Sequence, residues 1–524
     1  MFGAKMEVTM SSRLSRRRFL EASGLALAGL PLAGAMAGAR MNKTSSAQQC
    51  DDNGCGYPVK PKSTLGYSYP NRLRKFTPDM QPDLADDEMR ITFLGTFGGP
   101  PVRLAQQQMS IFVEVGPWTP EPPDPSKGFG KATDSFVFDL GGGCLANYAA
   151  MGITYSRMDK VFINHLHADH TADLPNLYCF GPVFDRKWPL YIWGQGRSGV
   201  ESPEGSGKYH EDGVADFCRH LREAWRWHTE GQSYLPTTYL EYQVPTRDDW
   251  HTPVPLTPVG DDAANDSYAI VPIELDWTKT GLDADGDPDY TNIAYQANGV
   301  TITHFPVIHY RKGSLGYKLE WNRLSLIYTS DTRPEKVSIQ QARNGGKGVD
   351  VFIHEMSPAQ ELGVMKTMGL TWPDRSAPGW DQSLDQMNAI VESAHTPQGA
   401  FGCLLSRIDP RPQLAVAVHF PVEDDIVECA YSSVRKHFPE GDYPQFGKDI
   451  VWPTDLMVLK VKKGKNGKPP KIEQFMGEVS DYTWGPFQNV YGPMADPKYP
   501  DPKSQLDTTN LIEAEDDTYC ENGY

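Results

Sequence analysis

Cysteine is scarce in this chain, with 8 among 524 residues. So small a number excludes a fold that depends on a dense set of disulfides. No C-x-x-C pair is present, which argues against a zinc site built from cysteine. Cys50 and Cys55 stand five positions apart in a polar segment, and this spacing suits a local disulfide and two unpaired thiols equally. Metal binding would therefore have to use other side chains.

Basic residues are also few relative to acidic ones. The chain has 50 Lys and Arg against 67 Asp and Glu, a net charge of -17. This balance repels phosphate backbones, so nucleic acid is not expected as a partner. The hydrophobic fraction of 39% is ordinary for a globular protein and is enough to bury one large core or two smaller ones.

Long apolar runs are missing apart from one near the N-terminus. Residues 22–39 are apolar but are interrupted by glycines and Pro31, and the run is short for a membrane span, so no stable membrane anchor is expected. The run follows Ser15-Arg16-Arg17-Arg18-Phe19-Leu20 and ends in Ala37-Gly38-Ala39. This segment resembles a twin-arginine signal with an A-x-A cleavage site. The resemblance implies a signal peptide over residues 1–39, recognition by the twin-arginine export machinery, and a periplasmic or secreted product.

Short β-type runs dominate residues 88–461, where we expect the catalytic domain. They are Met89 to Leu94, Ser110 to Val115, Ser135 to Asp139, Lys160 to Asn164, Gly299 to Ile308, Leu315 to Trp321, Leu324 to Thr329, Val349 to Ile353, Leu414 to His419 and Leu456 to Val461. Helical patterns lie between them, at Asp212 to Trp227, Gln382 to Ala394 and Asp424 to His437. Strands and helices mixed in this way predict a layered α/β domain.

Three segments flank or interrupt this pattern. Residues 40–87 are rich in Pro, Asp, Lys and Ser and are expected to form an extended N-terminal arm. Residues 185–298 are rich in Trp, Tyr, Pro and Asp, and we interpret them as a large insertion over or beside the active site. Residues 462–524 are expected to form a C-terminal extension that wraps the domain.

Three histidines and an aspartate lie within six positions, in His165-Leu166-His167-Ala168-Asp169-His170, directly after an apolar run. The chain has only 13 histidines, so such a cluster is not expected by chance. Imidazole and carboxylate are ligands that zinc prefers. The H-x-H spacing lets two imidazoles reach one ion, while Asp169 and His170 can reach a second. The segment therefore predicts the start of a two-metal site.

The pattern H-x-H-x-D-H after a strand resembles the hallmark of the metallo-β-lactamase fold, an αββα sandwich with the metals at one edge of the β layers. Ahead of it, Phe138-Asp139-Leu140-Gly141-Gly142-Gly143 resembles the first motif of that family. The resemblance implies that Asp139 supports the metal loop by hydrogen bonding without itself contacting a metal.

Three later segments resemble the remaining ligand motifs. His309, in Phe305-Pro306-Val307-Ile308-His309, stands where the ribonuclease Z and arylsulfatase-like branch has its next histidine. His304 is the alternative, but on a regular strand it faces the opposite side. Tyr328-Thr329-Ser330-Asp331-Thr332-Arg333-Pro334 resembles the S/G-D-T-R segment, whose carboxylate bridges both metals, and His419 follows a late apolar strand.

The resemblance implies a ligand set for two divalent ions, for which zinc is the first expectation and manganese and iron remain open. One ion would take His165, His167 and His309, the other Asp169, His170 and His419, and Asp331 and a water would bridge them. Lactam-hydrolysing members commonly carry cysteine at the position of Asp331, so β-lactam hydrolysis is disfavoured. Diiron redox members carry Glu at the position of His167, which disfavours that class.

Two further segments point to the ribonuclease Z branch. Ile353-His354-Glu355-Met356-Ser357 resembles its H-E-A-T motif, and His395-Thr396-Pro397 stands where it has H-S-T. The resemblance implies that Glu355 and His395 cooperate in proton transfer and act with Asp169 in catalysis. A plain ion pair, or a position at a helix end, is the alternative role for Glu355 and His395.

A reaction follows from this resemblance. A hydroxide held between two cations would attack phosphorus, sulfur or carbon, and His395, oriented by Glu355, would protonate the leaving oxygen. Export and acidic charge favour a sulfate ester or phosphodiester of a small organic molecule as substrate. The alternative is a ribonuclease Z-type endonuclease that processes transfer RNA at its 3′ end. The sequence leaves the oligomeric state open, a homodimer included.

Overall fold

The structure is a computed structural model. It describes residues 72–99, 103–120, 130–233, 266–370, 373–422, 424–438, 441–465 and 467–478. The expected signal peptide, the Cys50 and Cys55 pair, and most of both terminal extensions lie outside these residues. The chain divides into two compact units, one of which includes Glu361–Leu384. That unit contains most of α8 (Gln360–Thr367) and the start of α9 (Trp380–Ala394).

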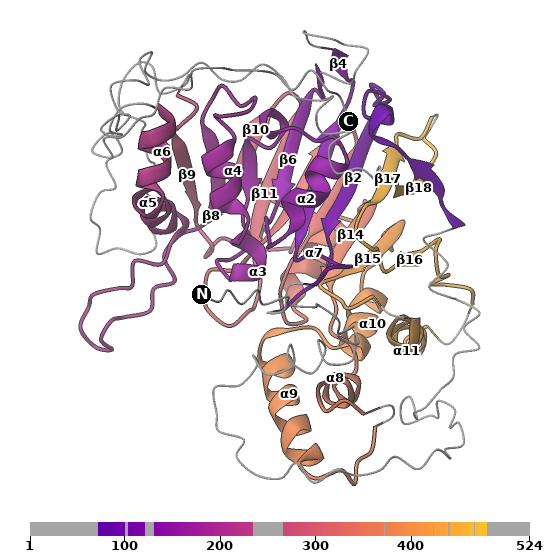
Figure 1. The fold of residues 1–524 in the computed structure, drawn as a ribbon. Helices are drawn as coiled ribbons and strands as arrows, with labels where there is room; N and C mark the ends of the chain where they lie inside the picture. The colour runs from indigo at the N-terminus through magenta and orange to yellow at the C-terminus, as the bar shows by residue number, and fades with distance from the viewer. Residues whose placement is uncertain are drawn as a thin grey trace, which may run out of the picture. The chain divides into compact units, whose positions relative to one another are not determined.

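The larger unit contains a nine-stranded sheet (Figure 1). Its strand order is β1 (Arg74–Phe76), β18 (Lys471–Gly477), β17 (Met457–Lys462), β2 (Glu88–Gly95), β3 (Ser110–Val115), β6 (Asp134–Phe138), β7 (Lys160–Phe162), β8 (Leu190–Gln195) and β9 (Ile270–Leu275). Strands β6 to β9 run parallel. Both faces are apolar because alternate side chains enter different clusters: Ile111 and Val113 lie in one, and Phe112 in the other.

A seven-stranded sheet packs against it through the first of these clusters. Its order is β10 (Ile293–Ala297), β11 (Val300–Pro306), β12 (Leu315–Trp321), β13 (Leu324–Tyr328), β14 (Val351–Glu355), β15 (Leu414–Val418) and β16 (Ile450–Val451). Strands β12 and β13 form a hairpin whose two turn residues, Asn322 and Arg323, have φ of 48° and 67°. These left-handed values are those of a turn that matches the twist of the strands.

Helices cover the two outer faces. On the nine-stranded sheet they are α2 (Cys144–Ala150), α4 (Leu174–Phe180) and α5 (Val214–Ala224), whose buried side chains share a cluster with Phe112. On the other sheet α7 (Lys336–Arg343) and α10 (Gln398–Ser406) lie outside, and α11 (Asp424–Arg435) packs on α10. The Phe401 ring of α10, for example, contacts the ring of His354 in β14 at 5.6 Å. The predicted αββα sandwich is therefore confirmed.

The segment 185–298, expected to be an insertion, contains three strands of the sandwich. β8 and β9 extend the nine-stranded sheet, and β10 forms an edge of the other. The aromatic strand Leu190–Gln195 pairs with β7 and therefore belongs to the sheet, while the placement of an insertion over or beside the active site stays a prediction. The other expected boundaries stay predictions. Within the residues that the structure describes, no helix is long and apolar enough to cross a membrane.

The sheet topology brings several strand ends to one edge. Strands β6 and β7 are parallel neighbours in one sheet, and β13, β14 and β15 are parallel neighbours in the other. β11 runs in the direction of β13, because both are antiparallel to β12 between them. The residues that follow these strands therefore meet at the carboxyl ends of the strands, the usual place for a site in α/β sheets.

Candidate metal centre

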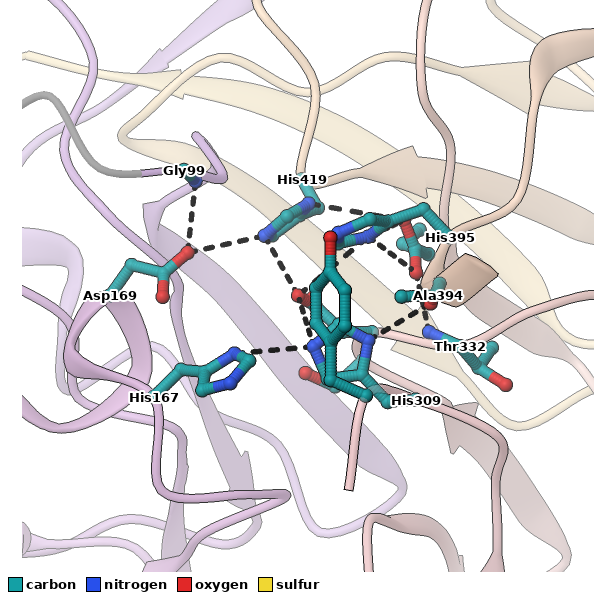
Figure 2. Close-up of polar contacts among 12 residues, drawn as sticks. Gly99, His167, Asp169, His309, Thr332, Ala394, His395 and His419 are labelled. Atoms are coloured by element: carbon teal, nitrogen blue, oxygen red, sulfur yellow. Dashed lines mark hydrogen bonds and ion pairs between the residues drawn. The ribbon is translucent and has the colours of Figure 1, made fainter. Parts of the chain in front are cut away.

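Three histidines form the first ligand group. His165 and His167 follow β7, and His309 follows β11. One ring nitrogen of each lies within 4.8 Å of the others. His309 Nε2 is 3.2 Å from His167 Nδ1, while His309 Nδ1 donates to the carbonyl of Ala394 at 2.9 Å, which aims Nε2 at the cluster (Figure 2). The arrangement offers three imidazole nitrogens to one point.

A second group contains Asp169, His170, Asp331 and His419, again with one ligand atom from each within 4.8 Å of the others. His170 belongs to α3 (Ala168–Thr171), and His419 follows β15. The carboxylate of Asp169 lies 3.3 Å from His419 Nε2 and accepts a hydrogen bond of 2.9 Å from the backbone N–H of Gly99 (Figure 2). The other carboxylate, Asp331, follows β13.

Asp331 contacts both groups with its two oxygens. Oδ1 is 3.4 Å from His170 Nε2, in the second group. Oδ2 is 3.1 Å from His419 Nε2 and 3.8 Å from His309 Nε2, so it lies between the groups. All seven residues that the sequence motifs single out as ligands are therefore brought together, with Asp331 where a bridging carboxylate would have to be.

Three buried atoms of these groups have no hydrogen-bond partner among the described residues. They are Nε2 of His165, Nε2 of His170 and Oδ1 of Asp331. Leaving a buried polar atom unsatisfied costs about 1–3 kcal/mol. Bound cations would satisfy all three, because each atom faces the place where the two groups meet. The residues present therefore fit a pair of divalent metal ions.

The electrostatics of the site also suit cations. Burial lowers the pKa of His309 to about 4, which keeps its imidazole neutral and able to coordinate. Burial raises the pKa of the Asp331 carboxyl, but the neighbouring His419 and His170 outweigh it and hold this pKa well below its usual range. Burial lowers the pKa of His419, but the carboxylates of Asp331 and Asp169 outweigh it and raise this pKa to about 10. The carboxylates thus favour positive charge here, whether it is carried by a proton or by a metal.

Asp139 supports the centre from behind. It follows β6 with a left-handed φ of 55°, and its side chain is fully buried. Oδ1 accepts from the backbone N–H of Asn164 at 2.8 Å, and Oδ2 lies 2.9 Å from His170 Nδ1. Oδ2 also accepts from the hydroxyls of Tyr328 at 2.6 Å and Ser330 at 2.9 Å. The carboxylate thereby orients His170 and joins the strand ends of the two sheets.

Glu355 and His395 form a pair beside the second group. Glu355 ends β14, and its oxygens lie 3.0 and 3.1 Å from His395 Nδ1. Glu355 also accepts a hydrogen bond from the backbone N–H of Thr332, directly after Asp331. Burial lowers the pKa of His395, but the carboxylates of Glu355 and Asp331 outweigh it and raise the pKa of this imidazole above its usual value. The pair therefore has the geometry for proton delivery that the motifs predict.

The structure resolves one alternative and adds residues that the motifs did not reveal. His304 points away from the centre, with Nε2 3.1 Å from the carbonyl of Asp276, so His309 is the residue that joins the cluster. Asn164 orients the ring of His165 at 2.8 Å. A Cβ on Gly98 would lie 2.0 Å from the His419 ring, so only glycine fits there. In the sequence, the Gly98-Gly99 pair after β2 was the signal that the backbone lies close to another group here.

A cavity of about 420 Å³ opens beside the three-histidine group. Its lining consists of His165, Leu166, His167, Gln195, Ser198, Asp212, His309, Tyr310, Arg311, Lys312 and Ser314. Apart from Leu166, which follows β7, the residues that are not ligands come from the end of β8, from the residues after it and from the loop between β11 and β12. A cavity of this size is in the range of small-molecule sites.

No family model matches the chain. Parts of it are similar to curated ribonucleases Z: 39% identical over 61 residues to that of Treponema denticola, which is 12% of this chain and 20% of the relative. With that of Synechocystis the identity is 27% over 156 residues, 30% of this chain and 41% of the relative. The matched segments thus span between about a fifth and two fifths of these relatives.

Among solved structures, the Bacillus subtilis metallo-β-lactamase fold protein YhfI is 12% identical with a TM-score of 0.40, and the similarity covers 71% of this chain and all of that one. Human tRNase Z, short form, is 16% identical with a TM-score of 0.38 over 70% of this chain and 98% of that one. Zn²⁺-bound PqqB from Methylobacterium extorquens is 12% identical with a TM-score of 0.36, covering 71% and 99%. The two sheets with helices on both outer faces form an αββα sandwich, and segments of the sequence are similar to ribonucleases Z.

Proposed function

We propose that this protein is a metal-dependent hydrolase that cleaves a phosphodiester or sulfate ester of a small organic molecule. The observation that carries the proposal is Asp331, whose two oxygens contact both ligand groups while three buried ligand atoms around it have no partner in the described structure. Two divalent ions, zinc first among them, would be held by His165, His167, Asp169, His170, His309, Asp331 and His419. When bound, such ions supply a nucleophile at neutral pH and neutralise developing negative charge.

The protein's own residues divide the remaining work. Glu355 holds the imidazole of His395 by hydrogen bonds of 3.0 and 3.1 Å, and His395 delivers a proton to the leaving oxygen. Asp139 fixes the ring of His170, and the N–H of Gly99 fixes the carboxylate of Asp169. The ligands are thus preoriented before any substrate arrives.

The similarity to ribonuclease Z supports a phosphodiester as the bond that is cleaved, and it favours a ribonuclease Z-type endonuclease as the second candidate. The net charge of -17 opposes binding of a long RNA backbone. We therefore place a small ester first and the nuclease second.

Metal analysis and a substrate panel would test the proposal. We expect purified protein to bind two divalent ions per chain and to hydrolyse bis(p-nitrophenyl) phosphate or p-nitrophenyl sulfate. Asp331→Ala should abolish turnover, and Lys448→Met, on an exposed surface away from the cluster, should not. Efficient cleavage of a precursor transfer RNA without any small-ester turnover would replace our first choice by the second.

We also propose that the protein is exported. The support is the twin-arginine segment Ser15-Arg16-Arg17-Arg18-Phe19-Leu20 with its apolar run and Ala37-Gly38-Ala39 end. A double substitution of Arg16 and Arg17 by lysine should retain the protein in the cytoplasm of a bacterial host, as followed by cell fractionation. Unchanged export of the variant would contradict the proposal.

A further inference from the structure

The cavity beside the three-histidine group lies on a different side of the cluster from the proton donor. Its lining contains His165, His167 and His309 but not His395. In Figure 2, His167 and His395 approach the cluster from different sides, with His309 close to both. The ring centroid of Tyr310 is 5.9 Å from that of His167 and also 5.9 Å from that of His395, so the tyrosine stands between the two regions.

This placement bears on the two parts of the substrate. In a displacement at phosphorus or sulfur, the group that leaves takes its proton from His395 and so departs on the His395 side. A sulfate monoester has no second organic group, and nothing of it would fill the cavity. A phosphodiester has one group that leaves and one that is retained. The cavity is large enough for a small retained group.

The polar groups of the cavity show what the retained group would need. Gln195 is 7% exposed, and its Oε1 is buried without a hydrogen-bond partner among the described residues. Gly313, with φ of 115°, lies so close that a Cβ there would stand 3.2 Å from Gln195 Cγ. The loop after His309 therefore closes against Gln195 and holds its amide at the wall of the cavity. Because an amide group both donates and accepts, the part of the Gln195 side chain that faces the cavity can hydrogen-bond a hydroxyl of the ligand.

One positive charge at the cavity is not neutralised. Arg311 is paired with Asp212 at 2.7 Å, and Ser198 donates to the same carboxylate at 2.6 Å. Lys312, next in the chain, has no ion pair or hydrogen bond among the described residues. In a chain with a net charge of -17, a free ammonium beside the ligand histidines favours an anionic ligand group.

We infer that the substrate is a phosphodiester whose retained group is small, hydroxylated and anionic, and that this group binds in the cavity to Gln195 and Lys312. The inference rests on the proposed function. Water forms the new P–O bond and the bond to the leaving oxygen breaks. The leaving group departs as an alcohol with a proton from His395, and the retained group stays on a phosphate monoester that carries the oxygen of the water. A proton released by the water returns to His395 through solvent, so the cycle is closed.

Three synthetic phosphodiesters that share the same leaving group would test the inference. Each contains p-nitrophenol, and the retained groups are methyl, 2-carboxyethyl and 2,3-dihydroxypropyl. We expect kcat/KM to be several times higher for the last two than for the methyl diester. Lys312→Met should lower the carboxyethyl-to-methyl ratio by about fivefold, the size of an exposed ion pair. Gln195→Leu should lower the dihydroxypropyl-to-methyl ratio by about tenfold. Lys448→Met, at another surface cavity, is the matched control and should keep both ratios.

Each outcome decides the inference. Equal kcat/KM values for the three diesters, or turnover of p-nitrophenyl sulfate with none of the diesters, would overturn it while leaving an ester hydrolase in place. If no ester is hydrolysed, the proposed function fails, and calorimetry on the metal-loaded protein then tests the cavity alone. Binding of 2-carboxyethyl phosphate should exceed that of methyl phosphate, and Lys312→Met should remove the difference. Equal binding of both phosphates by the unsubstituted protein would reject the cavity assignment.

Discussion

Asp139→Ala should weaken both the fold and the affinity for metal. The carboxylate accepts from four groups: the N–H of Asn164, the Nδ1 of His170 and the hydroxyls of Tyr328 and Ser330. An alanine would leave these buried donors unsatisfied, at a cost of about 1 kcal/mol each if water enters and more if it does not. We therefore expect the free energy of unfolding of the metal-free protein to fall by about 4 kcal/mol.

The two effects can be measured separately. Urea unfolding of the metal-free protein gives the stability change, and zinc titration against a competing chelator gives the affinity, which should fall by about 10- to 100-fold because His170 loses its orientation. Ser110→Ala is the control, since the Ser110 hydroxyl bonds to the backbone carbonyl of Asp139 at 2.8 Å and to the hydroxyl of Tyr148 at 3.0 Å but not to the Asp139 carboxylate. It should leave the zinc affinity unchanged. An Asp139→Ala variant within 1 kcal/mol of the original stability, or with unchanged zinc affinity, would refute the reasoning.

Three further predictions concern charge and metal. Asp331→Ala should bind fewer than two metal ions per chain by elemental analysis, and two retained ions would contradict a bridging role. Burial lowers the pKa of His304 from 6.5 to about 4. The unfolded chain therefore gains a proton first as the pH falls, and stability should drop by about 3 kcal/mol between these pH values. His304→Gln should remove that part of the slope in unfolding curves, and an unchanged slope would exclude it. Glu114→Ala would leave the buried guanidinium groups of Arg90 and Arg157, now 2.6 and 2.5 Å from its carboxylate, without an acidic partner. It should cost about 3–5 kcal/mol in urea unfolding, and a loss of a few tenths would refute this.

The strands next to the metal ligands were predictable because their signals are local. Ser110 to Val115 and Leu315 to Trp321 were expected with the bounds that β3 and β12 have. Ser110 to Val115 is a short, mostly apolar run, and Leu315 to Trp321 alternates apolar side chains with Lys318 and Glu320, so each carries a local strand pattern. Such runs, together with the helical patterns between them, predicted a layered α/β domain. The αββα order was implied by the resemblance of His165 to His170 to the hallmark motif of the metallo-β-lactamase fold.

Strands β8 and β9 were missed for a non-local reason. Leu190–Gln195 contains Tyr191, Trp193 and Gly194, and it lies among Pro- and Asp-rich sequence that is typical of loops. Its identity as a strand depends on pairing with β7 on one side and β9 on the other. β9 is separated from it by more than seventy residues, so no short window of sequence contains both partners.

The candidate ligands can be recognised in the sequence, whereas the residues that orient them cannot. A ligand must be a histidine or an acid, and their rarity and spacing made His165 to His170 visible in the sequence. The orienting groups are defined by backbone geometry. Asp139, directly after β6, and Ser330, two residues after β13, both adopt left-handed φ values, 55° and 53°. Such values are uncommon for residues other than glycine, so the residue type does not predict them.

The residues of the cavity are less predictable from the sequence than those of the metal centre. Gln195 ends a strand that the sequence patterns do not reveal, and Lys312 belongs to a loop more than a hundred residues later. Neither residue type has the selectivity for one role that histidine has, so only the fold shows that they line one cavity. The chemistry of bond cleavage can therefore be predicted from ligand motifs. The choice of substrate depends on residues whose meaning comes from the two sheets that bring them together.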